Sequence, residues 1–319
     1  LRSLAAQTFR DFEVIVVDNG STDDSVEVAR RHGAQVIPNP QNRGFCAANN
    51  QGIAASASPW IALLNNDAEA DPQWLAELVN TAERHSQAGM VASKILVWED
   101  PSVIDKCGHL MYPDGQNRGR GSGQRDRGQF DTEEEVLWPD GCAALYRHAM
   151  LEETGGFDED FFAYADDADL GMRGRIAGWE AWYAPRAVVR HHRGATLGLT
   201  SVWRLSLIER NRVLLVVKLF PWRLLWQNAG YYLARIVASL WVAIIRPPSQ
   251  QEELRRYPGL RGKVMVGWAL LRGLLSSLPL LPKMLAKRRT VLRRRSARQI
   301  VEMLQRYRIT LKALIGESA

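Results

Sequence analysis

The chain has 319 residues, 46% of them hydrophobic, which is enough for one catalytic domain and a further region of about 100 residues. Its net charge of +6 combines two unlike parts: residues 1–199 hold 18 basic and 30 acidic side chains, a net of −12, and residues 200–319 hold 23 and 5, a net of +18. The three cysteines are odd in number and lack CxxC spacing, so they indicate neither a disulfide framework nor a cysteine zinc site and favour a reducing compartment.

Short apolar runs alternate with helical patterns in the first part of the chain. Residues 12–17 form a β-branched run that predicts a buried strand ending at the polar turn Asp18-Asn19-Gly20-Ser21. Residues 60–64 predict another strand, which ends at Asn65-Asn66-Asp67. The same reading gives a strand at 35–38 and helices at 22–32, 47–56 and 72–84. This alternation predicts an α/β fold with an open, mostly parallel, mixed sheet flanked by helices.

Residues 112–135 are rich in glycine and charge and have no apolar period. We therefore expect a long loop there, and long loops inside compact domains are usually functional or disordered. Order returns from residue 136, with a strand-like stretch to 146 and a helix to 154. A further helix of about ten residues begins at Asp166-Asp167-Ala168-Asp169 and stops at Gly178, since glycine commonly follows a helix end.

After about residue 200, Trp, Leu and Val are interleaved with Arg and Lys. Residues 224–245 and 264–281 are long enough to span a bilayer, but Arg235 and Arg272 interrupt them, and a charge at the centre of a span costs about 2.5–3.5 kcal/mol. We expect residues 201–319 to form an all-helical, basic, amphipathic region whose helices lie on an anionic membrane surface. For residues 201–219 the alternative is packing on the preceding domain as ordinary core.

Two groups of acidic residues are candidates for chemistry. Asp67, together with Asn65, offers the hard oxygen ligands that Mg²⁺ or Mn²⁺ prefers. The acids at 166–169 can supply a carboxylate that accepts a proton. Each has a simpler reading: a polar loop after a strand for the first, and acids that complement a helix dipole for the second. Asp18 likewise has the chemistry of an Asx turn.

Together these residues resemble the inverting family 2 glycosyltransferases of the GT-A fold, particularly the rhamnosyltransferase-like enzymes of bacterial cell-surface polysaccharide synthesis. The likeness covers about residues 1–200 and depends on the order and spacing of residues 17–23, 42–45, 63–67, 155–159, 166–170 and His191. Such families begin with one more strand, which contacts the donor base and is absent from this chain. The resemblance therefore implies a catalytic domain at 1–200 that lacks its first strand, a helical membrane-interface region at 201–319, and a flap on the acceptor side at 112–135.

The resemblance implies transfer of a hexose, such as rhamnose, from a dTDP- or UDP-sugar to a glycan or lipid-linked acceptor, with inversion and with Mg²⁺ or Mn²⁺. Asp67 would bind the metal with His191, and Asp167 would be the catalytic base, beside Asp166, which replaces the family's Glu. The implied donor-binding residues are Asp18, Asn19, Asp23, Asn42, Gly44, Asn49 and Asn65, and the implied acceptor-side residues are Asp169 and Trp179. A surface histidine pair for His191 and core packing for Trp179 are the alternatives.

Other classes fit the sequence less well. An inactive glycosyltransferase-like scaffold of a membrane assembly would have lost Asp67 or the acids at 166–169, and both are retained. A sugar-1-phosphate nucleotidyltransferase would show a glycine-rich basic loop, a dehydrogenase a G-x-G-x-x-G turn, and a processive synthase a Gln-x-x-Arg-Trp motif. The apolar residues between the charges of the last region favour lipid over nucleic acid as its partner. We expect a peripheral or monotopic protein at the cytoplasmic face of the plasma membrane.

Overall fold

The computed structural model describes residues 1–192, 201–245 and 259–314, and the chain divides into two compact units. The first unit contains Leu1–His109 and Gly119–His192, and the second contains Leu110–Arg118 and Arg193–Ala319. The tip of a hairpin within the first two hundred residues therefore belongs to the second unit. No pattern in the sequence predicts that residues 110–118 belong to the second unit.

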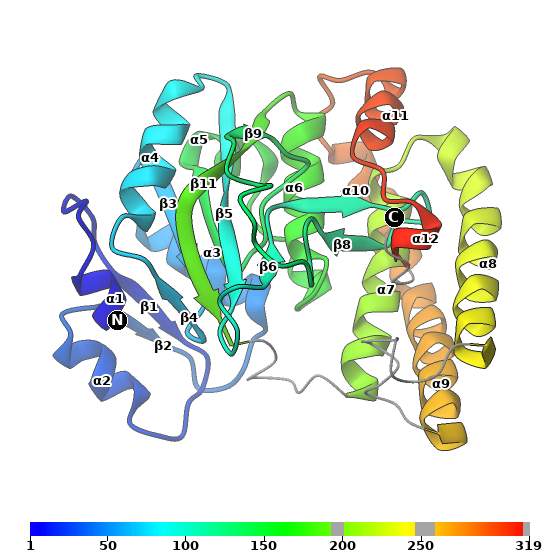
Figure 1. Cartoon of the computed structure of the whole chain (residues 1–319), viewed down its shortest axis with the longest axis horizontal. Coiled ribbons are helices and arrows are strands. Elements are labelled where there is room, and N and C mark those ends of the chain that lie inside the picture. The colour runs from blue at the N-terminus through cyan, green and yellow to red at the C-terminus, as the bar shows by residue number, and fades with distance from the viewer. Residues whose placement is uncertain (193–200, 246–258, 315–319) are drawn as a thin grey trace. The chain divides into compact units, whose positions relative to one another are not determined.

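The first unit is built on a mixed sheet of seven strands (Figure 1). Its main path runs β3-β10-β5-β11-β4, with β6 beside β5 and β9 beside β11. Strands β5 and β11 are parallel, and the other pairs in this sheet are antiparallel. Strands β1 and β2 form a separate parallel pair. The bounds are β1 (Ile15–Asp18), β2 (Gln35–Pro38), β3 (Trp60–Leu64), β4 (Ala68–Ala70), β5 (Ala88–Val97), β6 (Ile104–Lys106), β7 (His109–Met111), β8 (Asn117–Gly119), β9 (Glu134–Glu135), β10 (Ala143–Arg147) and β11 (Glu180–His191).

Helices flank this sheet, so the expected mixed α/β fold is confirmed. The helices of the first unit are α1 (Arg2–Ala5), α2 (Ser25–Arg31), α3 (Phe45–Ala55), α4 (Trp74–Arg84), α5 (His148–Thr154), the 3₁₀ turn η1 (Glu159–Phe161) and α6 (Asp166–Ile176). Those of the second are α7 (Val202–Leu219), α8 (Trp222–Ile245), α9 (Gly259–Ser277), the 3₁₀ turn η4 (Leu278–Leu280), α10 (Leu281–Thr290), α11 (Ala297–Arg306) and α12 (Leu311–Leu314).

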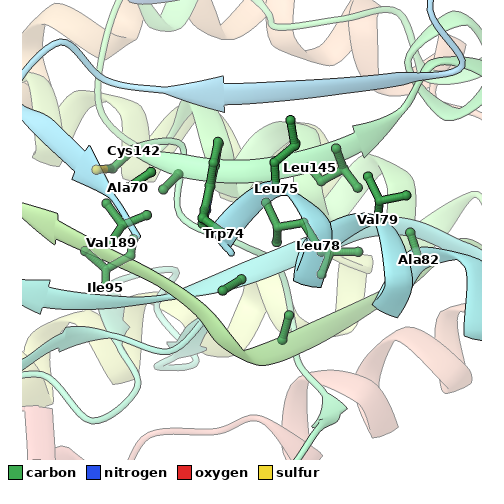
Figure 2. Close-up of a cluster of buried hydrophobic side chains, with 14 residues drawn as sticks. Ala70, Trp74, Leu75, Leu78, Val79, Ala82, Ile95, Cys142, Leu145 and Val189 are labelled. Atoms are coloured by element: carbon green, nitrogen blue, oxygen red, sulfur yellow. The ribbon is translucent and has the colours of Figure 1, made fainter. Parts of the chain in front are cut away.

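Helix α4 holds the sheet through one apolar face. Trp74, Leu78 and Ala82 recur at every fourth position, so they lie on one side of the helix and pack on the strands, as Figure 2 shows. The Trp74 indole also donates a hydrogen bond to Ser93 of β5, at 2.8 Å. Burial of each large side chain contributes about 1.5–3 kcal/mol. This packing fixes β5 and β11, whose parallel carboxyl ends reach the same edge of the sheet.

The expected long loop at 112–135 is present, with the short strands β8 and β9 as its regular elements, and ion pairs fasten its second half. Strand β9 pairs with β11, and the charges of the segment pair with cations elsewhere in the first unit. Lys94 of β5 lies 3.0 Å from Asp126 and 2.5 Å from Asp131, and Arg175 of α6 lies 2.6 Å from Glu135. Because these partners are distant in sequence, the local pattern resembled a solvated loop.

The second unit has a buried ionic network at its centre. Arg235, which interrupts the apolar run of α8, is buried and contacts Asp114 at 2.5 Å and Glu209 at 3.2 Å. Arg212 contacts the same two residues, at the Glu209 carboxylate and the Asp114 carbonyl. The expectation that the basic residues of this region meet lipid is therefore wrong for Arg235, whose charge is balanced inside the protein.

Helix α9 has two unlike faces. Its buried residues are small and recur along one side, and a Cβ at Gly273 would lie 2.7 Å from the Ser206 carbonyl of α7, so the two helices pack closely there. The large apolar residues of the opposite side are exposed: Leu260, Val264, Trp268, Leu271, Leu275 and Leu278. An exposed stripe of this size on a helix marks an interaction surface.

Candidate functional site

His191 and Asp67, expected to share a site, do lie together. His191 ends β11, and its Nε2 lies 3.5 Å from Asp67 Oδ1 while its Nδ1 lies 2.9 Å from Asp105 Oδ2. Burial opposes a charge on this ring, but the hydrogen bonds to Asp105 and Asp67 raise the pKa of His191 to about 12. The neighbouring His192 turns outward and stacks on Trp98, so the two histidines have different environments.

One oxygen of the Asp67 carboxylate lies where a metal ligand would be expected. Its Oδ1 is buried, and among the residues that the structure describes its polar neighbour is His191 Nε2, at a long 3.5 Å. In an octahedral site with bonds of about 2.1 Å, neighbouring ligand atoms lie about 3 Å apart, close to the separation of Asp67 Oδ1 and His191 Nε2. Without an ion, the His191 ring holds a proton between the two carboxylates. A divalent cation would have to replace the proton on Nε2, and the spacing of the carboxylate oxygen and the ring nitrogen fits such an ion, with Asp105 orienting the imidazole.

A second cluster surrounds Asp167 at the start of α6. His109 Nε2 lies 3.0 Å from Asp140 Oδ2 and 3.4 Å from Asp167 Oδ2. The ammonium of Lys106 contacts the same oxygen of Asp140. The imidazole is buried and stacks on Trp138, with ring centroids 5.4 Å apart. The three groups His109, Asp140 and Asp167 could hold a cation by their spacing alone, but Lys106 already supplies one.

Electrostatics support a protonated His109. Burial disfavours its charge, but the hydrogen bonds to Asp140 and Asp167 outweigh this and raise the pKa of His109 to about 9. Burial likewise opposes ionisation of Asp140, yet the charges of Lys106 and His109 hold its pKa well below the usual range. Two cations and two carboxylates thus balance in this cluster.

Three buried polar atoms near Asp167 lack partners among the described residues. They are His109 Nδ1, Trp138 Nε1 and Tyr146 Oη. Nearly all buried polar groups in native proteins are satisfied by protein, water or ligand. Because these atoms are enclosed, ordered water is the partner that fits them.

The loop before α6 is strained. Phe162, Tyr164 and Ala165 have φ of 65°, 67° and 55°, a region that costs residues other than glycine about 1–3 kcal/mol each. This loop leads directly into Asp166 and Asp167. Burial and the adjacent charge of Asp167 raise the pKa of Asp166 well above its usual range.

Asp169 does not face a substrate, contrary to the expectation for the acceptor side. Its carboxylate is fully buried and lies 2.7 Å from Arg173 Nε, one turn along α6. Arg173 also donates to the carbonyls of Thr154 and Gly156, at 2.6 Å each. The pair therefore joins α6 to the end of α5.

Asp18, Asn19 and Asn42 join the loops that follow β1 and β2. Both oxygens of Asp18 accept a hydrogen bond from the Ser21 amide, three residues along the chain, so the side chain stabilises the loop locally with a spacing one residue longer than that of an Asx turn. Asn19 Nδ2 donates to Asn42 Oδ1 at 3.0 Å and to the Gly44 carbonyl at 3.1 Å. Gly44 has φ of 89°, and a Cβ there would clash with a neighbouring ring, so only glycine fits.

The remaining donor candidates have local contacts. Asp23 accepts from Ser25 at the start of α2, and this hydrogen bonding lowers its pKa. Asn49 donates to the Phe45 carbonyl one turn earlier in α3. Asn65 is half-buried at the end of β3, two residues before Asp67.

Trp179 lies at the wrong end of the sheet for the expected acceptor contact. It precedes β11, whereas His191 ends that twelve-residue strand. Its indole donates to Glu153 at 2.9 Å, and Arg147 lies over its ring. Its contacts are therefore those of a packing residue.

Sequence reasoning missed four residues of the two clusters: Asp105, Lys106, His109 and Asp140. Asp140 lies in a Pro-Asp-Gly sequence that reads as a turn, and it does accept from the Cys142 amide. The other three belong to the short strands β6 and β7, where nothing in the local pattern distinguishes a functional side chain. Only the pairing of β6 with β5 reveals their position.

Comparison with known sequences shows the family to which the chain belongs. The profile described as glycosyl transferase family 2 matches residues 1–155. The N-acetylglucosaminyl-diphospho-decaprenol L-rhamnosyltransferase of Mycobacterium tuberculosis is 30% identical over 221 residues, which cover 62% of this chain and 72% of that protein. The chain belongs to glycosyltransferase family 2. An O-antigen biosynthesis protein of Myxococcus xanthus is 29% identical over 207 residues, covering 61% of this glycosyltransferase and 16% of the relative.

Solved structures share the fold of this glycosyltransferase. GalNAc-T7, solved with UDP, GalNAc and Mn²⁺, has a TM-score of 0.55 at 13% identity over 88% of this chain and 53% of that one. Residues 1–349 of TarS from S. aureus, in complex with UDP, give 0.50 at 16% identity over 91% and 86%. At these identities the likeness supports the GT-A type of fold.

The buried Asp169–Arg173 pair predicts a stability effect in this glycosyltransferase. Asp169→Asn should lower the free energy of unfolding by about 3–5 kcal/mol, because it leaves the Arg173 charge buried without its carboxylate. Asp167→Asn, which leaves that pair intact, should cost less. Urea denaturation followed by circular dichroism measures both. Equal losses in the two variants would contradict a special structural role for Asp169.

Proposed function

We propose that this glycosyltransferase moves a hexose from a dTDP- or UDP-sugar to a hydroxyl group of a glycan or lipid-linked acceptor, with inversion of the anomeric carbon. The observation that carries the proposal is the pair of separate acidic clusters, one with a buried carboxylate oxygen beside an imidazole and one with a carboxylate held by a cation. An inverting displacement needs these two functions on opposite sides of the sugar. The mycobacterial relative's name supports rhamnose as the sugar and a diphospholipid-linked acceptor.

Asp67 and His191 are the residues that would hold Mg²⁺ or Mn²⁺. A bound divalent cation neutralises the negative charge that develops on the diphosphate as it leaves. Asn65, beside this pair, can offer its amide to the donor. Asp18, Asn19, Asp23, Asn42, Gly44 and Asn49 remain the candidates for the donor side, either by contact or by shaping the loops after β1 and β2.

Asp167 is the proposed catalytic base. As the acceptor oxygen bonds to the anomeric carbon and the bond to the diphosphate breaks, the hydroxyl proton passes to the Asp167 carboxylate. Burial raises the pKa of Asp166, which favours its protonated form and a role as hydrogen-bond donor. His109 is a positioning residue: its ring contacts the Asp167 carboxylate, and Asp140 with Lys106 holds the ring.

The second unit is proposed to attach the enzyme to the cytoplasmic face of the plasma membrane. Its exposed apolar residues include Trp222, Trp226 and Trp241 of α8 and the stripe of α9, within a region of net charge +18. The stretch Gly259–Thr290 is long and apolar enough to cross a membrane by composition. Arg272 within it and the close packing of α9 on α7 favour an interfacial position.

Asp67→Ala should abolish transfer and greatly weaken metal-dependent donor binding without unfolding the protein, because it removes the carboxylate that would bind the metal beside His191. Calorimetric titration of UDP- and dTDP-sugars with and without Mn²⁺ measures this. Glu69→Ala, which removes an exposed acid two residues away, is the matched control. Wild-type donor affinity in the Asp67 variant would remove this residue from the metal site.

Asp167→Asn should retain donor binding and lose at least about a hundredfold in kcat, since it removes only the proton acceptor. His109→Gln should keep part of the activity and change its pH dependence. Below about pH 9 the wild-type ring is charged, so activity should fall as pH rises through that value. Without the cation, Asp167 faces Asp166 and Asp140, so the acid limb of kcat/KM should move to higher pH and the alkaline limb should disappear.

His32→Gln, at an exposed histidine, is the control for the pH profile. An active Asp167→Asn enzyme would refute the base itself. An inactive Asp167→Asn enzyme combined with an unchanged pH profile in His109→Gln would refute only the role of His109.

Full-length protein should sediment with anionic vesicles and be released, at least in part, by high salt or alkaline carbonate. Trp226→Ser combined with Trp268→Ser should weaken binding without loss of stability, because both side chains are exposed. Truncation after residue 200 is a poor test, since the hairpin tip would lose its partners Arg212 and Arg235. Carbonate resistance with a protease-protected α9 would show a membrane span instead.

A further inference from the structure

The junctions of α7 with α8 and of α10 with α11 enclose a pocket in the second unit. Its volume is about 510 Å³, and its lining combines arginines with apolar side chains. Arg288 and Arg289 come from the end of α10, and Arg293 and Arg295 follow in the link to α11. The complete lining is Pro221, Trp222, Leu285, Arg288, Arg289, Arg293, Arg295, Ala297 and Ile300.

Three of the pocket's arginines, Arg288, Arg289 and Arg293, have no acidic partner among the described residues. No carboxylate of the described residues lies within ion-pair distance of Arg288, Arg289 or Arg293, although other arginines of this unit are paired. Burial, followed by the nearby charge of Arg293, lowers the pKa of Arg288, and burial alone lowers the pKa of Arg293. Charges crowded in this way are stabilised by an anion that contacts several of them.

Two of these arginines are held in position by the end of α7. Arg288 donates to the Val217 carbonyl at 3.0 Å, and Arg293 donates to the Lys218 carbonyl at 3.4 Å. Arg288 also lies over the Trp222 ring, 4.2 Å from its centroid. Capping a helix end explains these contacts, but a guanidinium has five N–H donors, so most of them remain for a ligand. Arginines already fixed in place lose less entropy when they bind.

The apolar part of the lining continues onto the exposed surface. Trp222, the first residue of α8, is 59% exposed, and Leu285 is 41% exposed. A ligand that suits both parts has an anionic group for the arginines and a hydrocarbon part for the tryptophan and leucine. A soluble anion would gain nothing from the apolar wall.

We propose that this pocket binds the phosphate group of an anionic membrane lipid, of the phosphomonoester or diphosphate type. Terminal phosphates offer several oxygens to the fork-shaped guanidinium groups, whereas a phosphodiester offers fewer. The inference rests on the proposed membrane attachment and adds a specific headgroup site to it. Its test must therefore separate headgroup recognition from general attraction to a charged surface.

The experiment measures binding of the full chain to phosphatidylcholine vesicles that contain phosphatidic acid or phosphatidylglycerol at matched surface charge. Wild type should prefer phosphatidic acid by at least about tenfold, the effect of one additional charge-assisted hydrogen bond. Arg288→Lys with Arg293→Lys keeps the charge and should lose the preference while still binding phosphatidylglycerol. Arg261→Gln with Arg272→Gln removes two exposed charges of α9 and should weaken both forms of binding while keeping the preference.

A preference that survives in the Arg288/Arg293 lysine variant, with its circular dichroism spectrum unchanged, would overturn the pocket and leave the membrane attachment standing. Absence of wild-type binding to both anionic vesicles would overturn the attachment and the pocket together. Inorganic pyrophosphate serves as the soluble competitor in the same experiment. If it saturates the pocket as tightly as the lipid does, judged by competition with phosphatidic acid vesicles, the lipid assignment is wrong.

Discussion

The compensation of buried carboxylates is the constraint on which the site depends. A buried carboxylate without a partner is costly, so each one must find a cation or lose its charge. At this edge of the sheet His191 lies between Asp67 and Asp105, and His109 lies between Asp140 and Asp167. Asp166 lacks such a partner among the described residues, and burial raises its pKa. Asp67 Oδ1 has only the long contact with His191, and this separates the proposed metal position from the proposed base.

Buried carboxylates are also paired with cations in the second unit, where the pairs stabilise the packing of its elements. Asp114 and Glu209 are buried and fully engaged with Arg212 and Arg235, so that network holds helices and a hairpin tip together. Arg288, Arg289 and Arg293 of the pocket near Trp222 are the reverse case, because no carboxylate of the described residues pairs with them. The ion pairs of Asp114 and Glu209 stabilise the second unit. The three pocket arginines, which lack such partners among the described residues, indicate a site for an anionic ligand.

Local pattern was sufficient for much of the fold. The strands expected at 35–38 and 60–64 have those bounds as β2 and β3, because a short apolar run between turns needs no distant information. The pairing of Asp67 with His191 followed from a family resemblance. The role of Arg235, the ion pairs of the loop at 112–135 and the cluster around His109 could not be predicted, since they depend on partners between 26 and 121 residues away. The expectation for Asp169 failed because an acid at a helix start looks the same whether it faces solvent or a buried arginine.

The central claim is that the two clusters have different cations, a divalent metal at one and a protonated histidine at the other. Crystals grown with a nucleoside diphosphate and Mn²⁺ test it directly through the anomalous difference map. The account predicts one strong peak bonded to Asp67 and His191. A peak among His109, Asp140 and Asp167, with none at Asp67, would contradict it.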